Sequence, residues 1–342
     1  MKTLILPFLL LLTLFISCSQ NSDEIETLQK NAASYDVYVA GMENYKACYW
    51  KNNVKTSLVS PDSTSASKII VENNDVHVFG KTKTTFNGTY YYWENNVRKD
   101  LKQYLGISTN VEYQIFDMAI DNGDDYFVGY YDTTSPIANQ RYAVCVWKNG
   151  VKTVLNTYDS IIYTSSQLSI FNHQLYISSM INDGNTIKSG YFINNTFHEV
   201  PNITWLGNFT ETSTGINFLY ARDQNYYYRQ LATNTETPVG IASNQNLFEG
   251  KITGESNSND LYVMGATLEN FYYKNNIQTI VPIEPTYSVI KDMFVLDNNM
   301  YVIKQNPLLT GSKVYINNVE SQSISNSATN LNAFNSIFVV AN

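Results

Sequence analysis

The sequence predicts an all-β fold in which seven similar four-stranded units close into a ring. The 342-residue chain is 44% hydrophobic and only 15% charged, and it contains 27 tyrosines and 16 phenylalanines. Aromatic and β-branched residues favour strands over helices. Two short motifs recur along the chain, one of them six times and the other seven times. Composition therefore predicts strands, and recurrence predicts that the strands form repeated units.

The first motif is a pentad made of an aromatic residue, a polar residue, Asn-Asn or Asn-Gly, and usually a Val or Ile. Residues 147–151, WKNGV, are one copy. Both central positions of a two-residue type I′ turn need positive φ, which Asn and Gly tolerate best. Each pentad therefore predicts the turn of a β-hairpin. The copies begin at Trp50, Trp93, Trp147, Phe192, Tyr273 and Tyr315.

The second motif, such as DVHVFG from Asp75, lies upstream of each pentad and predicts a strand. A third apolar segment precedes it, so each unit supplies strands A, B, C and D. Seven units over residues 34–342 give about 44 residues per unit, the size of a four-stranded propeller blade. A weaker copy belongs to a unit whose hairpin has drifted to LATNTETPV. The copies begin at Asp36, Asp75, Asp124, Gln174, Ile216, Asp260 and Asn299.

The two ends of the chain predict how the ring closes. No A strand precedes Asp36, whereas NSIFVVAN at the C-terminus aligns with the A strands and stops where a B strand would begin. We expect this last strand to complete the first blade, which leaves no open edge. The pattern resembles seven-bladed β-propellers, and more narrowly the tandem-repeat propeller lipoproteins of Bacteroidota. An eight-bladed ring and a two-domain β-sandwich remain as alternatives.

The N-terminus has the features of an export signal. Lys2 is followed by the apolar run LILPFLLLLTLFIS and then by Cys18. The run resembles the lipobox of bacterial lipoproteins, which implies that Cys18 carries the lipid. Residues 1–17 would be the signal peptide, residues 18–34 the lipidated cysteine and a flexible tether, and residues 35–342 the propeller. An ordinary cleaved signal and a short membrane anchor are the alternatives, although the run is short for a span.

Charge and the tether sequence predict location and partners. The residues SDE, close behind Cys18, resemble the surface-export signal of Bacteroidota lipoproteins. We expect a protein of the cell envelope that is lipid-anchored to the outer membrane and faces the periplasm or the surface. Its formal charge is −8, and an acidic protein gains no counterion-release affinity for nucleic acid and is repelled by anionic lipid. We therefore expect no nucleic-acid partner, and membrane contact only through the lipid.

Cysteines and histidines give no catalytic pattern. Cys48 and Cys145 each lie two residues before a pentad tryptophan, with a whole repeat between them. Such positions should lie beyond the distance of about 7 Å that a disulfide can bridge, so we predict two buried free thiols. His77 takes the place of a tyrosine in the second motif and is predicted to be a strand residue. No Ser-His-Asp order, HExxH, phosphate loop or CxxC occurs.

Connectivity separates two ends of the ring. The A–B and C–D turns emerge at one end, which we call the turn face, and they are short and Asn-rich. The B–C and D–A connections emerge at the other end, the loop face, and are predicted to be long and different in every blade. Variable loops on a rigid scaffold usually carry binding residues. Aromatic rings beside polar groups suit sugars or protein side chains.

We therefore place the candidate ligand-binding residues on the loop face. Trp205 is the strongest candidate for an exposed aromatic residue because it breaks the tryptophan column of the pentads, although a tryptophan packed beneath a loop is an equally common outcome. The full set is Trp205, Tyr45, Tyr104, Tyr130, Tyr131, Asp132, Arg141, Tyr158, Tyr163 and Tyr287.

Two further patterns concern metals and modification. DNGDD at residues 121–125 is acidic, but it coincides with an A–B turn and lacks the spacing of a known calcium loop, so we expect no metal and no cofactor. DST, DTT and DSI resemble a short O-glycosylation signal of exported Bacteroidota proteins. That resemblance implies glycans at Ser63, Thr133 and Ser160.

The leading functional hypothesis is a non-enzymatic, lipid-anchored propeller that binds a protein or glycan through its loop face. One rival is a glycan lyase or hydrolase with its site at the central channel, for which a carboxylate pair about 5–9.5 Å apart would be evidence. Another rival is a purely structural surface component with a featureless loop face.

Overall fold

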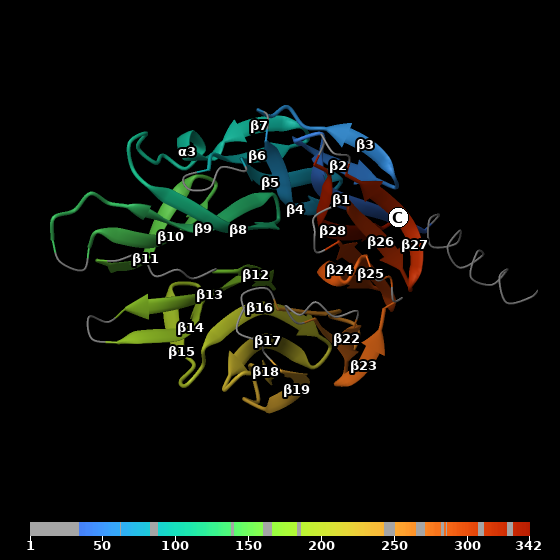
Figure 1. Cartoon of the computed structure of the whole chain (residues 1–342). Helices are drawn as coiled ribbons and strands as arrows, with labels where there is room; N and C mark the ends of the chain where they lie inside the picture. Colours follow the sequence, from blue (N-terminus) through green and yellow to red (C-terminus); the bar gives the residue numbers. More distant parts are fainter. Residues whose placement is uncertain are drawn as a thin grey trace, which may run out of the picture.

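The computed structural model describes residues 34–61, 63–82, 88–137, 140–159, 166–182, 186–242, 250–264, 271–281, 284, 286–306, 311–326 and 331–342. Within these ranges, seven antiparallel sheets of four strands each surround a common centre (Figure 1). The chain is thus an all-β, seven-bladed propeller, as predicted. The eight-bladed and β-sandwich alternatives are wrong.

Blade 1 is closed by the C-terminal strand. It consists, from the inside outwards, of β28 (Ala333–Ala341), β1 (Tyr35–Glu43), β2 (Lys46–Lys51) and β3 (Val54–Ser57). The pairing of β28 with β1 runs from Tyr35 opposite Ala341 to Met42 opposite Ala333. The first and last strands of the propeller therefore lie in one sheet, as the sequence predicted.

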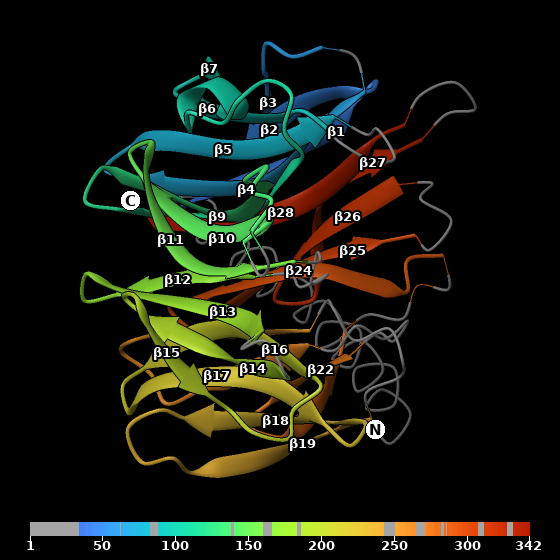
Figure 2. The same ribbon diagram turned by 90° about the vertical axis from the view of Figure 1, so that its left-hand side faces the viewer.

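The other blades come in chain order, each with its first strand innermost. Figure 2 shows the ring from the side of blades 3 and 4. Blade 2 contains β4 (Thr64–Glu72), β5 (Asp75–Thr82), β6 (Tyr90–Glu94) and β7 (Val97–Asp100), followed by the short helix α3 (Leu101–Tyr104). Blade 3 contains β8 (Tyr113–Asp121), β9 (Asp124–Asp132), β10 (Tyr142–Lys148) and β11 (Val151–Tyr158). Blade 4 contains β12 (Leu168–Phe171), β13 (Gln174–Asn182), β14 (Ile187–Ile193) and β15 (Thr196–Glu199).

Blades 5 to 7 complete the ring. Blade 5 contains β16 (Trp205–Thr212), β17 (Gly215–Arg222), β18 (Asn225–Gln230) and β19 (Glu236–Ala242). Blade 6 contains β20 (Lys251–Gly254), β21 (Leu261–Met264), β22 (Phe271–Lys274) and β23 (Ile277–Ile280). Blade 7 contains β24 (Val289–Leu296), β25 (Asn299–Gln305), β26 (Gly311–Ile316) and β27 (Val319–Ser325).

The pentads form the predicted C–D turns. Asn95 and Asn96 have φ of 47° and 68°, as a type I′ turn requires. Positive φ at both turn residues recurs in four other blades. These pairs are Asn52–Asn53, Asn149–Gly150, Asn275–Asn276 and Asn317–Asn318.

The first Asn of the pentad has a second role that sequence reasoning missed. The Asn95 side chain accepts a hydrogen bond from the Val76 N–H (2.9 Å) and donates one to the Asp75 carboxylate (2.7 Å). The C–D turn is thereby tied to the start of strand B. The Asp that heads the second motif and the Asn of the pentad are thus partners. The same pair of bonds is made by Asn52, Asn149 and Asn275, and by Asn317 with the side-chain oxygen of Asn299 in place of a carboxylate.

The glycine that ends the second motif lies inside strand B and is required there for a steric reason. At this position strand A carries a β-bulge, as between Ile115 and Asp117 in β8. A Cβ atom on Gly129 would lie 2.1 Å from the main-chain oxygen of Gln114. In blade 3, glycine therefore lets strand B pass this close to the bulge.

Two predictions about loops and cysteines have different outcomes. The B–C connections of blades 1 and 5 are two-residue turns, Asn44–Tyr45 and Asp223–Gln224, so the expectation that every such loop is long is wrong. Blade 5 instead lengthens its C–D connection, because its hairpin has lost the pentad. Cys48 and Cys145 are free and buried, as predicted, and burial raises the pKa of each thiol to about 12. In the part of the chain that the structure describes, no helix is long and apolar enough to cross a membrane.

Candidate functional site

Part of the predicted set gathers at the loop face of blade 3. Tyr130, Tyr131 and Asp132 end β9, and Arg141 immediately precedes β10. The Arg141 Nε lies 3.7 Å from an Asp132 carboxylate oxygen, and its side chain is 59% exposed. The guanidinium also lies 5.3 Å from the centroid of the Tyr142 ring. Asp132 and Arg141 therefore form a charged pair at the surface.

Trp205 is not an exposed platform, so that expectation is wrong. It is 3% exposed and packs in the apolar core between blades 5 and 6 with Leu219 and Ile252. Its ring contacts Tyr226 edge-to-face, with centroids 5.9 Å apart. Trp205 begins the innermost strand of blade 5 rather than lying in a loop. Trp205 lies outside the tryptophan column because it belongs to strand A instead of strand C, and not because it is exposed.

The remaining candidates are dispersed. Tyr130 and Tyr158 are buried in one cluster, and the Tyr131 hydroxyl accepts a hydrogen bond from Lys152 (2.7 Å). Tyr287 lies beneath the Lys313 ammonium in blade 7. Tyr45 lies in its two-residue turn and is 39% exposed. Tyr163 falls outside the described residues.

Tyr104 points toward the opposite end of the ring. Helix α3 directs it into the junction between blades 2 and 3, where its hydroxyl donates to Asp125 at 2.7 Å. Asp125 follows the A–B turn of blade 3. Tyr104 therefore reaches toward the turn face, and its predicted place on the loop face is wrong. A four-residue helix carries no periodic sequence signal from which this direction could be read.

A polar hollow of about 540 Å³ opens on the loop face of blade 2. It is bounded by the end of the B–C connection, at Gly88 and Thr89, and by the D–A connection, at Asp100, Lys102 and residues 109–113. We call it the loop-face hollow. Both classes of variable connection thus contribute to one concave surface.

Internal hydrogen bonds hold the wall of the loop-face hollow in place. The Lys102 ammonium donates to the main-chain oxygens of Thr109 (2.7 Å) and Val111 (3.0 Å) and lies over the Tyr113 ring. The Asp100 carboxylate caps α3 by accepting the Lys102 N–H (3.1 Å). The wall is therefore preorganised, which lowers the entropy cost of binding.

The loop-face hollow adjoins the charged pair of blade 3 through Glu112. Its main-chain oxygen accepts the Asp132 N–H (2.8 Å), and its carboxylate accepts the Tyr130 hydroxyl (3.4 Å). Burial raises the pKa of Tyr113 to about 12 and also raises the pKa of Tyr130. These phenols stay protonated at neutral pH and act as hydrogen-bonding groups rather than bases.

The carboxylates of the innermost strands are engaged in structure. Asp117 accepts hydrogen bonds from the Lys68 ammonium (2.6 Å) and the Leu168 N–H (2.8 Å), which links blades 2, 3 and 4. Asp292 accepts them from Lys251 and from the Ile337 N–H, which links blades 6, 7 and 1. Polar side chains bridge the other junctions between innermost strands as well, and we call the whole set the polar belt. Its other members are Asn335, Ser169 and Asn208.

The acidic turn at residues 121–125 divides its carboxylates among separate partners. Asp121 pairs with His173, Asp124 with Lys148, and Asp125 with Tyr104. Among the described residues no group of three or more His, Cys, Asp or Glu side chains is arranged to hold a metal ion.

A buried group of titratable side chains lies between blades 2 and 3. A nitrogen of His77 lies 2.6 Å from the Tyr92 hydroxyl, and burial lowers the pKa of His77. Asp125 is 5% exposed, burial raises its pKa, and one of its carboxylate oxygens has no hydrogen-bond partner. His77 lies in its strand between blades, as predicted. Because the Tyr104 side chain packs over this group, we interpret the group as part of the packing between blades 2 and 3.

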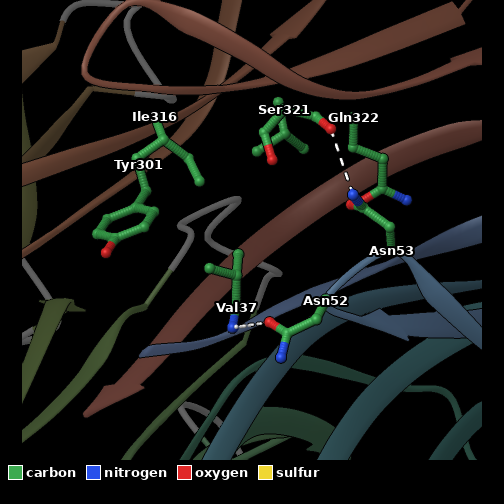
Figure 3. Close-up of a pocket in the computed structure, with 8 residues that line it drawn as sticks. Val37, Asn52, Asn53, Tyr301, Ile316, Ser321 and Gln322 are labelled. Atoms are coloured by element: carbon green, nitrogen blue, oxygen red, sulfur yellow. Dashed lines mark hydrogen bonds between the residues drawn. The ribbon is translucent and has the colours of Figure 1, made fainter. Parts of the chain in front are cut away.

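A second cavity, of about 110 Å³, lies between blades 7 and 1 on the side of the turn face. Figure 3 shows Val37, Tyr301 and Ile316 around it, with Asn53 and Gln322 at one side. Asn53 donates a hydrogen bond across the junction to the Ser321 main-chain oxygen (3.3 Å). We call this cavity the closing slot. Sequence reasoning did not foresee it.

The modification sites remain predictions. The Thr133 hydroxyl donates to the Arg141 main-chain oxygen (3.0 Å) and accepts the Ser135 N–H (3.1 Å), so it is engaged within its own loop. Ser63 lies in the connection before β4 with a φ of 60°. Ser160 and Cys18 fall outside the described residues, as does the whole segment 1–33.

No protein-family model and no curated protein sequence matches the chain. Solved structures resemble the chain at low sequence identity. Apo AztD from Citrobacter koseri has a TM-score of 0.44 and 10% identity, over 90% of this chain and 98% of that chain. TolB from Acinetobacter baumannii has a TM-score of 0.45 and 9% identity, over 88% and 67%. A chain of a nidogen–laminin complex has a TM-score of 0.42 and 8% identity, over 89% and 98%. This similarity concerns the fold alone.

Proposed function

We propose that the protein is a lipid-anchored binding scaffold of the cell envelope, and that it recognises a glycan or protein partner through the loop-face hollow and the adjoining Asp132–Arg141 pair. The observation that carries the proposal is the hollow itself. It is concave, preorganised and lined by hydrogen-bonding groups beside Tyr113. Such surfaces suit sugar hydroxyls and polar side chains.

Several observations favour binding over catalysis. The Asp117 and Asp292 carboxylates each accept bonds from a lysine and a main-chain N–H, unlike the available acid and base of a glycosidase. The two described thiols are buried, and their raised pKa keeps them protonated. These groups hold the blades together.

The path of the chain supports presentation of the loop face away from the membrane. Strand β1 starts at the turn face, because the Val37 N–H is held by Asn52 of a C–D turn. A tether from Cys18 would therefore join the ring at the turn face, and the loop face lies at the opposite end. Labelling of the expressed protein with a palmitate analogue tests the anchor. Incorporation should disappear in Cys18→Ser, and retained incorporation would rule out lipidation at this residue.

Binding is best tested with the soluble chain from Ser19, which keeps every described strand because the first begins at Tyr35. We expect saturable binding on a glycan and secreted-protein array. Asn110→Trp places a large ring in the loop-face hollow and should weaken binding at least tenfold. Gln278→Trp, on the exposed outer strand of blade 6, is the matched control and should not change it.

Two outcomes would contradict the proposal. Equal binding by wild type and Asn110→Trp would exclude the hollow as the site. Absence of any ligand, with the fold intact by circular dichroism, would favour a structural envelope component. Trp205→Ala is unsuitable for this purpose because Trp205 belongs to the core, and its loss would change stability rather than a binding surface.

A further inference from the structure

Because the blades are repeats, the closing slot between blades 7 and 1 can be compared with the equivalent place between blades 2 and 3. There a side chain, that of Tyr104, fills the space. Between blades 2 and 3, the Tyr104 ring lies with its centroid 6.3 Å from that of Tyr92 and 6.4 Å from that of Phe127. The Lys99 ammonium lies 4.8 Å from the ring centroid, and the hydroxyl donates to Asp125. Tyr104 is therefore enclosed by blade 2 on one side and blade 3 on the other.

The walls of the two sites correspond position by position. On one side, Tyr92 of β6 pairs with Lys99, and the equivalent Val314 of β26 pairs with Gln322. Val314 and Gln322 both line the closing slot. One wall of the closing slot is thus formed by the same repeat positions as one wall of the Tyr104 site.

The opposite wall agrees. Asp125 is the second residue of its B-strand motif, and Val37 is the second residue of the motif in blade 1. Gly150 approaches the main chain of Tyr104, and the equivalent turn residue in blade 1 is Asn53. Val37 and Asn53 both line the closing slot (Figure 3). The closing slot therefore occupies the place that Tyr104 fills between blades 2 and 3.

The contents of the two sites differ because the chain takes a different path after strand D. In blade 2, β7 ends at Asp100, and α3 turns Tyr104 inward. In blade 7, β27 continues along β26 to Ser325, which pairs with Gly311. No helix begins at the corresponding position of β27, and a cavity of about 110 Å³ remains. The closing slot is smaller than the enclosed apolar cavity of about 150 Å³ that accepts benzene, but it is open to solvent on one side, so an aromatic ring can enter it in part.

We propose that the closing slot binds one aromatic side chain that a partner protein presents on a short helical turn, as α3 presents Tyr104. Val37, Val314 and Ile316 supply an apolar wall, and the amides of Asn53 and Gln322 lie where they can meet the main chain of the partner. The tether does not supply this side chain, because residues 19–33 contain no Phe, Tyr or Trp.

The chemistry of the slot selects among aromatic side chains. Asp125 accepts the Tyr104 hydroxyl, but its counterpart in the closing slot is Val37. A tyrosine hydroxyl placed against Val37 would lose its hydrogen bond to water and gain none from that side chain. The closing slot should therefore prefer phenylalanine to tyrosine. Val37 thus sets the preference of the closing slot for Phe over Tyr.

The test uses hexapeptides based on residues 100–105, DLKQYL, with blocked ends and with Tyr, Phe or Ala at the fifth position. Binding to the soluble chain from Ser19 is measured by peptide-observed NMR titration. We expect the Phe peptide to bind in the millimolar range, as suits one small anchor. The Tyr peptide should bind at least threefold more weakly and the Ala peptide at least tenfold more weakly. Failure of the Phe peptide to bind, or equal binding of the Ala peptide, overturns the proposal.

Variants locate the binding and separate it from changes in folding. Val37→Phe fills the slot and should weaken binding of the Phe peptide at least tenfold, whereas Val97→Phe, at an exposed position of blade 2, should not. Val37→Asp introduces a carboxylate at the position equivalent to Asp125. This variant should bind the Tyr peptide more tightly than the Phe peptide. Unchanged binding in Val37→Phe, or an unchanged preference in Val37→Asp with cooperative unfolding retained, overturns the assignment. Asn110→Trp should leave peptide binding intact, so this test fails or succeeds independently of the loop-face hollow.

Discussion

The junction between blades 2 and 3 and the junction between blades 7 and 1 are built from the same repeat positions but finished differently. The first contains Tyr104 and a buried Asp125, whereas the second has Val37 in place of that acid and keeps a cavity. The repeat determines the walls of a junction, and the connection after strand D determines its contents. A single helical turn thus separates a sealed junction from an open one.

On the channel side the same two junctions belong to matching arrangements. Lys68 and Asp117 link blades 2 and 3, and Asp117 also receives an N–H from blade 4. Lys251 and Asp292 link blades 6 and 7, and Asp292 also receives the Ile337 N–H from β28. The closing strand is therefore held by the same device as an ordinary blade. The polar belt is thus alike at both places, although the outer parts of the two junctions are filled differently.

The largest expected effect comes from breaking the belt at the closure. Asp292→Ala leaves the Ile337 N–H without its acceptor and the Lys251 ammonium with only the Met293 main-chain oxygen, and should lower the free energy of unfolding by about 3–4 kcal/mol. Asp117→Ala should cost a similar amount. The two differ in location, since only Asp292→Ala should speed amide hydrogen exchange along β28.

Urea unfolding and hydrogen exchange measure these two effects. Exchange at residues 337–341 that is as slow in Asp292→Ala as in wild type would show that β28 is held by its pairing with β1 alone. In that case the belt segments around Asp117 and Asp292 would have the same geometry, but the hydrogen bond from Asp292 would not stabilise β28.

Removing Tyr104 would make the sealed junction resemble the open one. Tyr104→Ala leaves a cavity and removes the hydroxyl from Asp125, and should lower the free energy of unfolding by about 2–3 kcal/mol. Tyr104→Phe keeps the ring and should cost about 1 kcal/mol, the loss of one hydrogen bond. Equal costs in urea unfolding would show that the hydrogen bond, and not the filling of the junction, stabilises this site.

The ring itself was predictable because repetition multiplies a weak signal. The Asn-Asn turns, the seven B strands and the unpaired C-terminal strand each predict the same closed arrangement. Even the bond between the pentad Asn and the leading Asp had a signal, because Asp36, Asp75, Asp124 and Asp260 all occur in units that carry the pentad. Repeat proteins reveal their architecture in this way.

The candidate sites were predicted poorly because they depend on departures from the repeat. Trp205 was placed in a loop, but it starts an inner strand and is buried. The direction of Tyr104 depends on Asp100 capping a four-residue helix, which periodicity does not reveal. The loop-face hollow and the closing slot arise where neighbouring connections differ, and one repeat compared with another predicts shared features rather than such differences.

The smallest expected effect concerns the acid that only the sealed junction contains. Burial raises the pKa of Asp125 in the folded protein above its unfolded value, so the folded state binds this proton more tightly. The contribution of Asp125 to stability is then greatest below the unfolded pKa and is lost as the pH rises through the folded pKa. Asp125→Asn removes this titration but keeps an oxygen acceptor for the Tyr104 hydroxyl. The stability of wild type relative to Asp125→Asn should therefore decrease in urea unfolding as the pH rises above the ordinary aspartate pKa of about 3.9. A stability difference that stays constant or increases with pH would mean that burial of the ionised Asp125 carboxylate costs no stability. In that case, having Val37 instead of an acid at the equivalent position would give the junction between blades 7 and 1 no advantage in stability at neutral pH.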